Sequence, residues 1–277
     1  MPGFFQRLLR SPSACTGMAI LLLVAAMGVA GPVFYPQGPW NMVGNPFSWP
    51  GSLPGAPLGT DALGRDMLAG ILHGSRVSLL IGIAATTAAL AIGIALGAVA
   101  GYFGGLADDA LMRFTDAVQT IPPFLLAIVI VVIVKPTVPT IILAIAAISW
   151  PTLARLVRAE FLRLRESEFV ASCKLIGMSD LRIILTQILP NCMAPIIVSA
   201  SIMVASAILT EAGLSFLGLG DPNVISWGTM VGMGRSDLRS GWYLVAIPGA
   251  AIMMAVLALN LLGDGLNDAL NTRLFTR

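Results

Sequence analysis

The apolar residues of this chain fall in long, nearly uncharged blocks, and this pattern restricts the fold more than any other feature. Crossing about 30 Å of hydrocarbon at about 1.5 Å per residue takes about 20 apolar residues in a helix. Six blocks approach that length, at residues 14–34, 77–101, 118–134, 138–156, 192–214 and 243–263. We therefore predict an all-α membrane protein with six transmembrane helices. The third span is short and abuts Pro122 and Pro123, which can end or kink a helix.

The composition supports one polytopic membrane domain. Only 11% of the 277 residues are charged and 57% are hydrophobic, whereas soluble domains carry about 25% charged residues. The net charge of +2 is too small for a nucleic-acid-binding surface, and the basic residues lie between apolar blocks. Cys15, Cys173 and Cys192 are too few and too scattered for a disulfide framework.

The positive charges predict how the chain is oriented, because cytoplasmic loops of membrane proteins carry the excess of Lys and Arg. With six spans and the N-terminus inside, both termini are cytoplasmic. Residues 1–13 then form a cytoplasmic segment, and residues 14–277 form the transmembrane domain. The first block could instead be a signal peptide cleaved near residues 28–30, but five more apolar blocks follow it, which favours an uncleaved anchor. The basic residues placed inside are Arg7, Arg10, Arg113, Arg155, Arg158, Arg163, Arg165, Lys174, Arg182, Arg273 and Arg277.

Sites for ATP hydrolysis, metal binding and hydrolytic catalysis are not apparent in the sequence. A phosphate-binding loop needs a Lys after a Gly, and neither Lys135 nor Lys174 follows one. His73 is the only histidine, so a cluster of histidine metal ligands cannot form. We therefore expect no catalytic, metal or cofactor site on this chain, and a membrane enzyme is disfavoured.

The connection at residues 157–190 is expected inside and is the most charged stretch. Residues 168–177 (EFVASCKLIG) and the segment after them indicate two short helices that break at Gly177, a residue free to adopt positive φ. One side of these helices would offer apolar residues to a partner: Phe169, Val170, Ile176, Leu181, Ile184, Leu185 and Ile188. A basic loop lying on an anionic lipid surface is the alternative.

This connection resembles the EAA loop of ABC importer permeases, the coupling helix that sits in a groove of the ATPase subunit. The spacing to Gly177 and the terminal Leu189-Pro190 match the motif. Ala171, Ser172 and Cys173 stand where the name-giving Glu would lie, and a Glu is found slightly earlier, at Glu168. The resemblance assigns ATPase coupling to Glu168, Ala171, Ser172, Gly177, Leu189 and Pro190.

Three further segments are similar to signatures of the dipeptide, oligopeptide and nickel permease family. They are residues 58–66 (LGTDALGRD), 211–220 (EAGLSFLGLG) and 260–268 (NLLGDGLND). The resemblance implies a type I ABC importer transmembrane domain in a bacterial inner membrane. It also implies a heterodimer with a homologous permease, two ATPase subunits that bind ATP and Mg, and an extracytoplasmic solute-binding protein. Peptides are the solute most often implied, and nickel is an alternative.

The outer loop and the surroundings of Glu211 carry the predicted outer-gate residues. The outer loop at residues 35–76 should be irregular at first and then form a short amphipathic helix capped by Thr60. Glu211, beside an apolar span, could support an outer gate, cap a helix or pair with Arg235 or Arg239. The residues assigned to the outer gate or its support are Asp61, Arg65, Asp66, Glu211, Gly218 and Gly220.

Two stripes lie on predicted spans. Gly93, Gly97 and Gly101 repeat at every fourth residue, which favours close helix packing. A polar stripe in the fifth span either lines the solute path or forms an interhelical hydrogen-bonding face; its members are Ser199, Met203, Ser206 and Thr210.

Together these features predict the permease subunit of an ATP-driven importer for peptides or a similar small solute. An ion-gradient-driven secondary transporter is the alternative. That class usually carries broken helices or ionisable residues at the membrane midplane, whereas the ionisable residues of this chain lie mainly at span ends.

Overall fold

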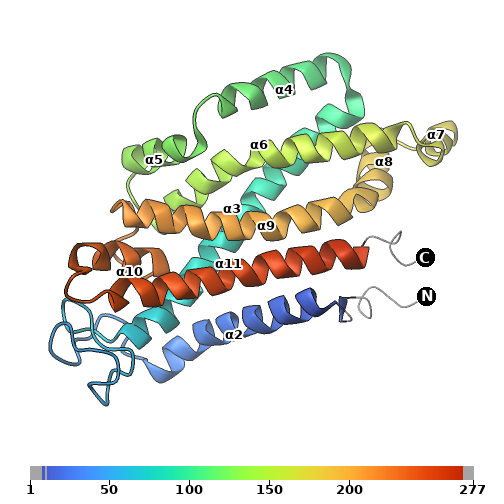
Figure 1. Cartoon of the computed structure of the whole chain (residues 1–277). Helices are drawn as coiled ribbons and strands as arrows, with labels where there is room; N and C mark the ends of the chain where they lie inside the picture. Colours follow the sequence, from blue (N-terminus) through green and yellow to red (C-terminus); the bar gives the residue numbers. More distant parts are fainter. Residues whose placement is uncertain (1–7, 10, 271–277) are drawn as a thin grey trace.

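The computed structural model describes residues 8, 9 and 11–270. Within these residues, five helices are long and apolar enough to cross a membrane. They are α2 (Pro12–Phe34), α3 (Met67–Phe103), α6 (Val138–Arg165), α9 (Leu189–Phe216) and α11 (Tyr243–Leu270). In Figure 1, α2, α11, α9 and α6 lie side by side, and α3 crosses behind them. The predicted all-α membrane fold is confirmed.

The third span is a broken helix instead of the single segment predicted at residues 118–134. α4 (Gly105–Gln119) and α5 (Pro123–Val134) are bent by 79° relative to each other. The break falls at Pro122 and Pro123, because a residue before proline avoids the helical region and Pro123 can begin a new helix. Counted as one broken span, the pair brings the candidate spans in the described residues to six.

The second span begins ten residues earlier than predicted, and Thr60 does not cap a helix. α3 starts at Met67, where the Oδ1 atom of Asp66 accepts the Leu68 N–H at 2.8 Å. The Thr60 hydroxyl instead donates to the Asn45 carbonyl at 2.6 Å inside the preceding loop. The irregular loop therefore covers residues 35–66, and the amphipathic segment is the first part of α3.

The glycine stripe of α3 packs against α6, as predicted. A Cβ atom on Gly97 would lie 2.8 Å from Val157 Cβ, and one on Gly101 would lie 2.7 Å from the Arg158 carbonyl oxygen. Real Cβ atoms do not approach so closely, so the two backbones meet only because these residues are glycines.

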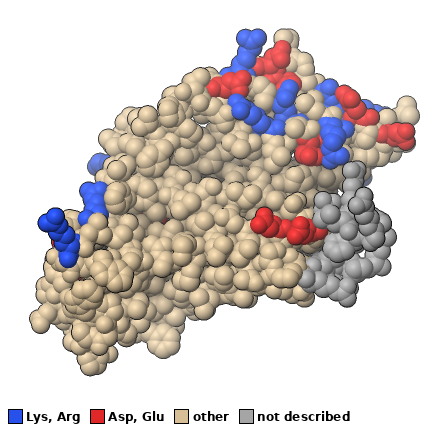
Figure 2. Space-filling view, in the orientation of Figure 1, with Lys and Arg blue, Asp and Glu red and all other residues tan. Residues whose placement is uncertain are grey.

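The bundle has two distinct ends (Figure 1). The elbow end carries α7 (Glu168–Leu175) and α8 (Asp180–Ile183), and α2 begins and α11 finishes there. The loop end carries residues 35–66, α10 (Trp227–Gly234) and the 3-10 turn η2 (Arg235–Asp237). Figure 2 shows charged side chains gathered at both ends of the visible face, with an uncharged band between them. Arg7, Arg10, Arg273 and Arg277, used above to predict orientation, lie outside the described residues.

Candidate functional site

The segment from Glu168 to Ile188, which we call the elbow, turns sharply at Gly177. Gly177 has a φ of +78°, as predicted. Its N–H donates to the Lys174 carbonyl at 3.0 Å, and the Met178 N–H donates to the Cys173 carbonyl at 3.1 Å. These two bonds form a Schellman motif, which ends α7 with a left-handed residue. A Cβ atom on Gly177 would meet nothing within 4 Å, so only backbone conformation requires glycine there.

The apolar side chains of the elbow divide into two groups. Leu175, Ile176 and Leu181 are 88%, 77% and 67% exposed at the turn, and Phe169 and Leu185 are also exposed. Clusters of exposed apolar side chains mark interaction surfaces. Leu175 was missed by the sequence prediction because helical spacing alone does not show which side of a short helix its own chain covers.

The other predicted apolar residues of the elbow are not available to a partner, which corrects the sequence prediction. Val170, Ile184 and Ile188 are buried in a cluster with Phe161 of α6. They hold the elbow against the bundle. Of the coupling residues predicted by resemblance, Leu189 is half-buried and the others are exposed: Glu168, Ala171, Ser172, Gly177 and Pro190.

The second part of the elbow is continuous with a span, whereas a separate short helix was predicted. α8 passes through the π-helical turn η1 (Ile184–Ile188) directly into α9. Pro190 has no N–H to donate within the first turn of α9, and a π turn accommodates such a gap. The Tyr102 hydroxyl of α3 donates to Asp180 Oδ1 at 2.5 Å and ties the start of this long helix to the bundle.

Ion pairs join α4 to α6, the helix that leads into the elbow. The Arg158 guanidinium of α6 donates to both carboxylate oxygens of Asp108 in α4, with Nη2 2.6 Å from Oδ2. Arg155 pairs with Asp116 at 2.6 Å in the same two helices. Two-point Arg–carboxylate contacts restrict geometry as well as adding energy. The helix that precedes the elbow is therefore held to α4 by two ion pairs.

At the loop end, Glu211 of α9 is a buried polar centre. Its side chain is 1% exposed, and Oε1 accepts hydrogen bonds at 2.7 Å from the hydroxyls of Ser215 and Ser226. Oε2 has no hydrogen-bond partner among the described residues. Neither Arg235 nor Arg239 pairs with Glu211 within that part of the chain, so the alternative of a surface ion pair is wrong.

The helix α10 was missed by sequence reasoning and joins α9 to α3. Ser226 and Thr229 form a reciprocal capping box at its start. The Trp227 backbone N–H donates to Ser78 at 3.1 Å, and its ring N–H donates to the Ile71 carbonyl at 3.0 Å. The Ser-Trp-Gly-Thr pattern was the available signal, but a glycine-rich stretch usually indicates a loop.

The predicted loop-end residues lie in two neighbouring groups. Asp61 Oδ1 accepts the N–H groups of Leu63 and Arg65, both at 2.8 Å, and Asp66 caps α3. Asp61 shares a small cavity with Met230 of α10, so this turn adjoins α10. In the second group, Glu211 contacts α10, Gly218 takes a φ of +86°, and Gly220 approaches Ser215 and Thr229.

The polar stripe of α9 lies on a partly open face. Ser206 is exposed, while Ser199, Met203 and Thr210 are half-buried. The Thr210 hydroxyl donates to the Ser206 carbonyl of its own helix at 2.8 Å. Exposed Ile202 and Leu209 flank the stripe. The stripe makes no hydrogen bond to another helix among the described residues.

A bundle of apolar helices with a fixed elbow at one end defines a multi-pass membrane protein. Residues 93–276 match the family of binding-protein-dependent transport system inner membrane components. This match covers more than half of the chain, and the chain belongs to that family. It is a permease subunit of a binding-protein-dependent ABC transport system, as the sequence resemblance predicted, and lies in the inner membrane.

Curated relatives extend over nearly the whole chain. The di/tripeptide transport system permease protein DppC of Pseudomonas aeruginosa is 39% identical and covers 98% of this chain and 91% of its own length. The dipeptide transport system permease protein DppC of Haemophilus influenzae is 38% identical, covering 94% and 90%. The glutathione transport system permease protein GsiD of Pectobacterium atrosepticum is 37% identical, covering 98% and 90%. None of these findings supports an ion-gradient-driven secondary transporter.

Proposed function

We propose that this permease subunit imports short peptides that an extracytoplasmic binding protein delivers. The similar proteins named above are permeases for dipeptides, di/tripeptides and glutathione, which is itself a tripeptide. The common element of those names is a short peptide. Nickel has no comparable support, because His73 is the only histidine and its Nε2 atom lies 3.0 Å from the Tyr35 carbonyl.

The elbow couples peptide import to ATP hydrolysis on partner subunits. The exposed apolar side chains at its turn are the observation that carries this proposal, because their own chain leaves them uncovered. They would fill a groove of an ATPase subunit, and two such subunits would bind ATP and Mg. Glu168, Ala171 and Ser172 are exposed on α7, where they can contact the same groove.

The long helix from the elbow to the loop end transmits the movement. Residues Asp180–Phe216 form one apolar helical stretch, about 55 Å long at about 1.5 Å per residue. Glu211, near its far end, holds α10 through Ser226 at 2.7 Å. A shift of the elbow therefore moves α10, and this connection supports alternating access with an outer gate at the loop end.

A second, homologous permease completes the solute path. The half-open face of α9 carries Ser206, Ile202 and Leu209 and would lie against that partner or the path between the two subunits. Ser199, Met203 and Thr210 would then line the path for the peptide. With the elbow facing the ATPases, both described ends of the chain lie on the cytoplasmic side.

Reconstitution into proteoliposomes tests the proposed function. The chain is assembled with its permease partner, ATPases and binding protein, and uptake of a radiolabelled dipeptide is measured with ATP inside the vesicles on the ATPase side. We expect uptake that requires ATP and the binding protein and is insensitive to a proton uncoupler. Uptake that persists without ATP and stops with the uncoupler would contradict the proposal.

A further inference from the structure

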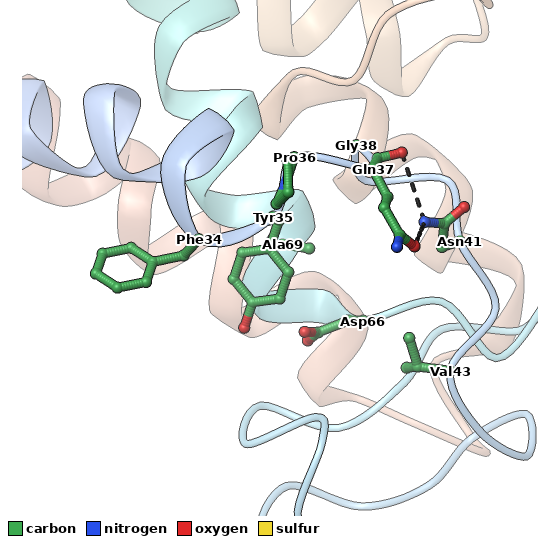
Figure 3. Close-up of a pocket in the computed structure, with 9 residues that line it drawn as sticks. All are labelled: Phe34, Tyr35, Pro36, Gln37, Gly38, Asn41, Val43, Asp66 and Ala69. Atoms are coloured by element: carbon green, nitrogen blue, oxygen red, sulfur yellow. Dashed lines mark hydrogen bonds between the residues drawn. The ribbon is translucent and has the colours of Figure 1, made fainter.

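A cavity of 230 Å³ opens at the loop end, between the end of α2 and the start of α3. Figure 3 shows residues that line it, among them Phe34 and Tyr35 from the end of α2 and Asp66 and Ala69 from the start of α3. Its lining includes neither Glu211 nor the polar stripe of α9, on which the proposed transport mechanism rests.

Asp66 brings an unpartnered carboxylate oxygen to this cavity. The side chain is 4% exposed, and Oδ1 is engaged as the cap of α3 through the Leu68 N–H. Oδ2 is buried and has no hydrogen-bond partner among the described residues. A buried carboxylate oxygen without a partner is costly, so it favours a cation or a donor at this position.

The neighbouring groups suit a cation and do not supply one. In Figure 3 the Tyr35 hydroxyl lies on the side toward which the Asp66 carboxylate points. Burial, then the negative charge of Asp66 and a side-chain hydrogen bond toward it, raise the pKa of Tyr35. This hydroxyl therefore stays neutral, and it can donate to the Asp66 carboxylate while its oxygen accepts from a bound cation. The guanidinium of Arg65 lies 4.8 Å from the centre of the Trp40 ring and is directed there instead.

The donor set favours an organic cation over a metal ion. Calcium takes about six to eight oxygen ligands, and no group of three or more His, Cys, Asp or Glu side chains that could hold a metal occurs in the part of the chain described. The rings of Phe34 and Tyr35 line the cavity, and aromatic faces attract ammonium groups. The volume is below the range of about 300–1,000 Å³ typical of sites for whole drug-sized ligands, so a small head group fits.

We propose that this cavity binds a primary ammonium group, held between Asp66 Oδ2 and the Tyr35 hydroxyl. A primary ammonium offers three N–H donors for these two oxygens. Two small molecules carry this chemistry at a membrane surface: a phospholipid with an ethanolamine head group and a short peptide with a free amino terminus.

Binding to the complete, delipidated transporter complex tests the proposal. Calorimetric titrations use ethanolamine, dialanine and N-acetyl-dialanine, and native mass spectrometry measures retention of phosphatidylethanolamine against phosphatidylcholine. Asp66→Asn removes the charge but keeps a good helix cap, and Asp61→Asn is the matched control in the same loop. Tyr35→Phe removes only the hydroxyl and is the second test variant, used if the Asp66→Asn complex does not assemble.

The proposal predicts at least tenfold weaker binding of the primary amine to Asp66→Asn and no change in Asp61→Asn. Binding of dialanine but not N-acetyl-dialanine identifies a peptide amine. Selective retention of phosphatidylethanolamine without dialanine binding identifies a lipid head group. Equal behaviour of acetylated and free dialanine together with equal retention of both lipids would overturn it, as would wild-type binding by Asp66→Asn and Tyr35→Phe. None of these readouts depends on transport, so the result is independent of the proposed function.

Discussion

The side chains of Glu211 and Ser226 are fifteen residues apart in the sequence and hydrogen bond at 2.7 Å, which fastens α10 to α9. Gly228 permits this approach, since a Cβ atom there would lie 2.7 Å from Ala212 Cα and 2.9 Å from Glu211 Oε1. The contact joins the loop end of the helical stretch Asp180–Phe216 to α10.

Glu211→Gln should impair transport more than assembly. The amide can still accept from Ser226, but one carboxylate oxygen is replaced by an NH₂ group with no acceptor provided nearby. Burying this unpaired donor costs about 1–3 kcal/mol, and a cost of about 1.4 kcal/mol in the gating step corresponds to about tenfold slower peptide uptake. Uptake and co-purification of the subunits are measured together, with exposed Glu166→Gln as the control. Normal uptake by Glu211→Gln would show that the contact is not part of the gate.

The sequence predicts the helical class, most span positions and the turn at Gly177, because these depend on local apolar length and backbone freedom. It does not predict where α3 begins, since Thr60 and Asp66 are both good caps and tertiary contacts decide between them. Thr60 is held by Asn45 in the folded loop, which leaves Asp66 to cap the helix.

The candidate site was less predictable where packing selects a face. Val170 and Ile188 have the same apolar character as Ile176, yet they are buried against α6 while Ile176 is exposed. The partner of Glu211 was also not predictable, because Ser226 comes from a glycine-rich stretch whose helix forms only against α3 and α9.

Gly97→Ala should destabilise the bundle. Its Cβ would lie 2.8 Å from Val157 Cβ, and overpacking of this kind costs about 1–3 kcal/mol. Gly249→Ala in α11 is the matched control, because a Cβ there meets nothing within 4 Å. Thermal unfolding in detergent should therefore show a lower Tm for the first variant and an equal or higher Tm for the second. Equal Tm losses in both would contradict the packing account.

Tyr102→Phe should loosen coupling at the elbow. It removes the 2.5 Å hydrogen bond to Asp180, which contributes about 1 kcal/mol to stability. The start of the helical stretch Asp180–Phe216 is then no longer tied to α3. We expect more ATP hydrolysed per peptide imported, measured in proteoliposomes. Asp180→Asn keeps an acceptor oxygen and should lie nearer to wild type. An unchanged ratio in Tyr102→Phe would mean that this bond is only structural.

The proposed orientation places the elbow inside and the loop end outside. In a background without Cys15, Cys173 and Cys192, single cysteines replace Ser52 in the loop or Lys174 in the elbow. An impermeant thiol reagent applied to intact cells should label the cysteine at position 52 and spare the one at position 174. Labelling of position 174 from outside would reverse the topology.

The most direct test of the account concerns Gly177, because the coupling proposal requires the elbow to keep its angle. A β-branched residue is an outlier at positive φ, and such strain costs about 1–3 kcal/mol, whereas Asn tolerates this region better. No atom lies within 4 Å of an added Cβ, so Gly177→Val changes conformation without a steric clash.

Co-purification of the ATPase subunits and peptide-stimulated ATP hydrolysis are measured for Gly177→Val, Gly177→Asn and the wild type. The account predicts that Gly177→Val inserts normally but loses ATPase association or stimulated hydrolysis, while Gly177→Asn retains most of both. Wild-type association and hydrolysis in Gly177→Val would contradict the assignment of this elbow as the coupling element.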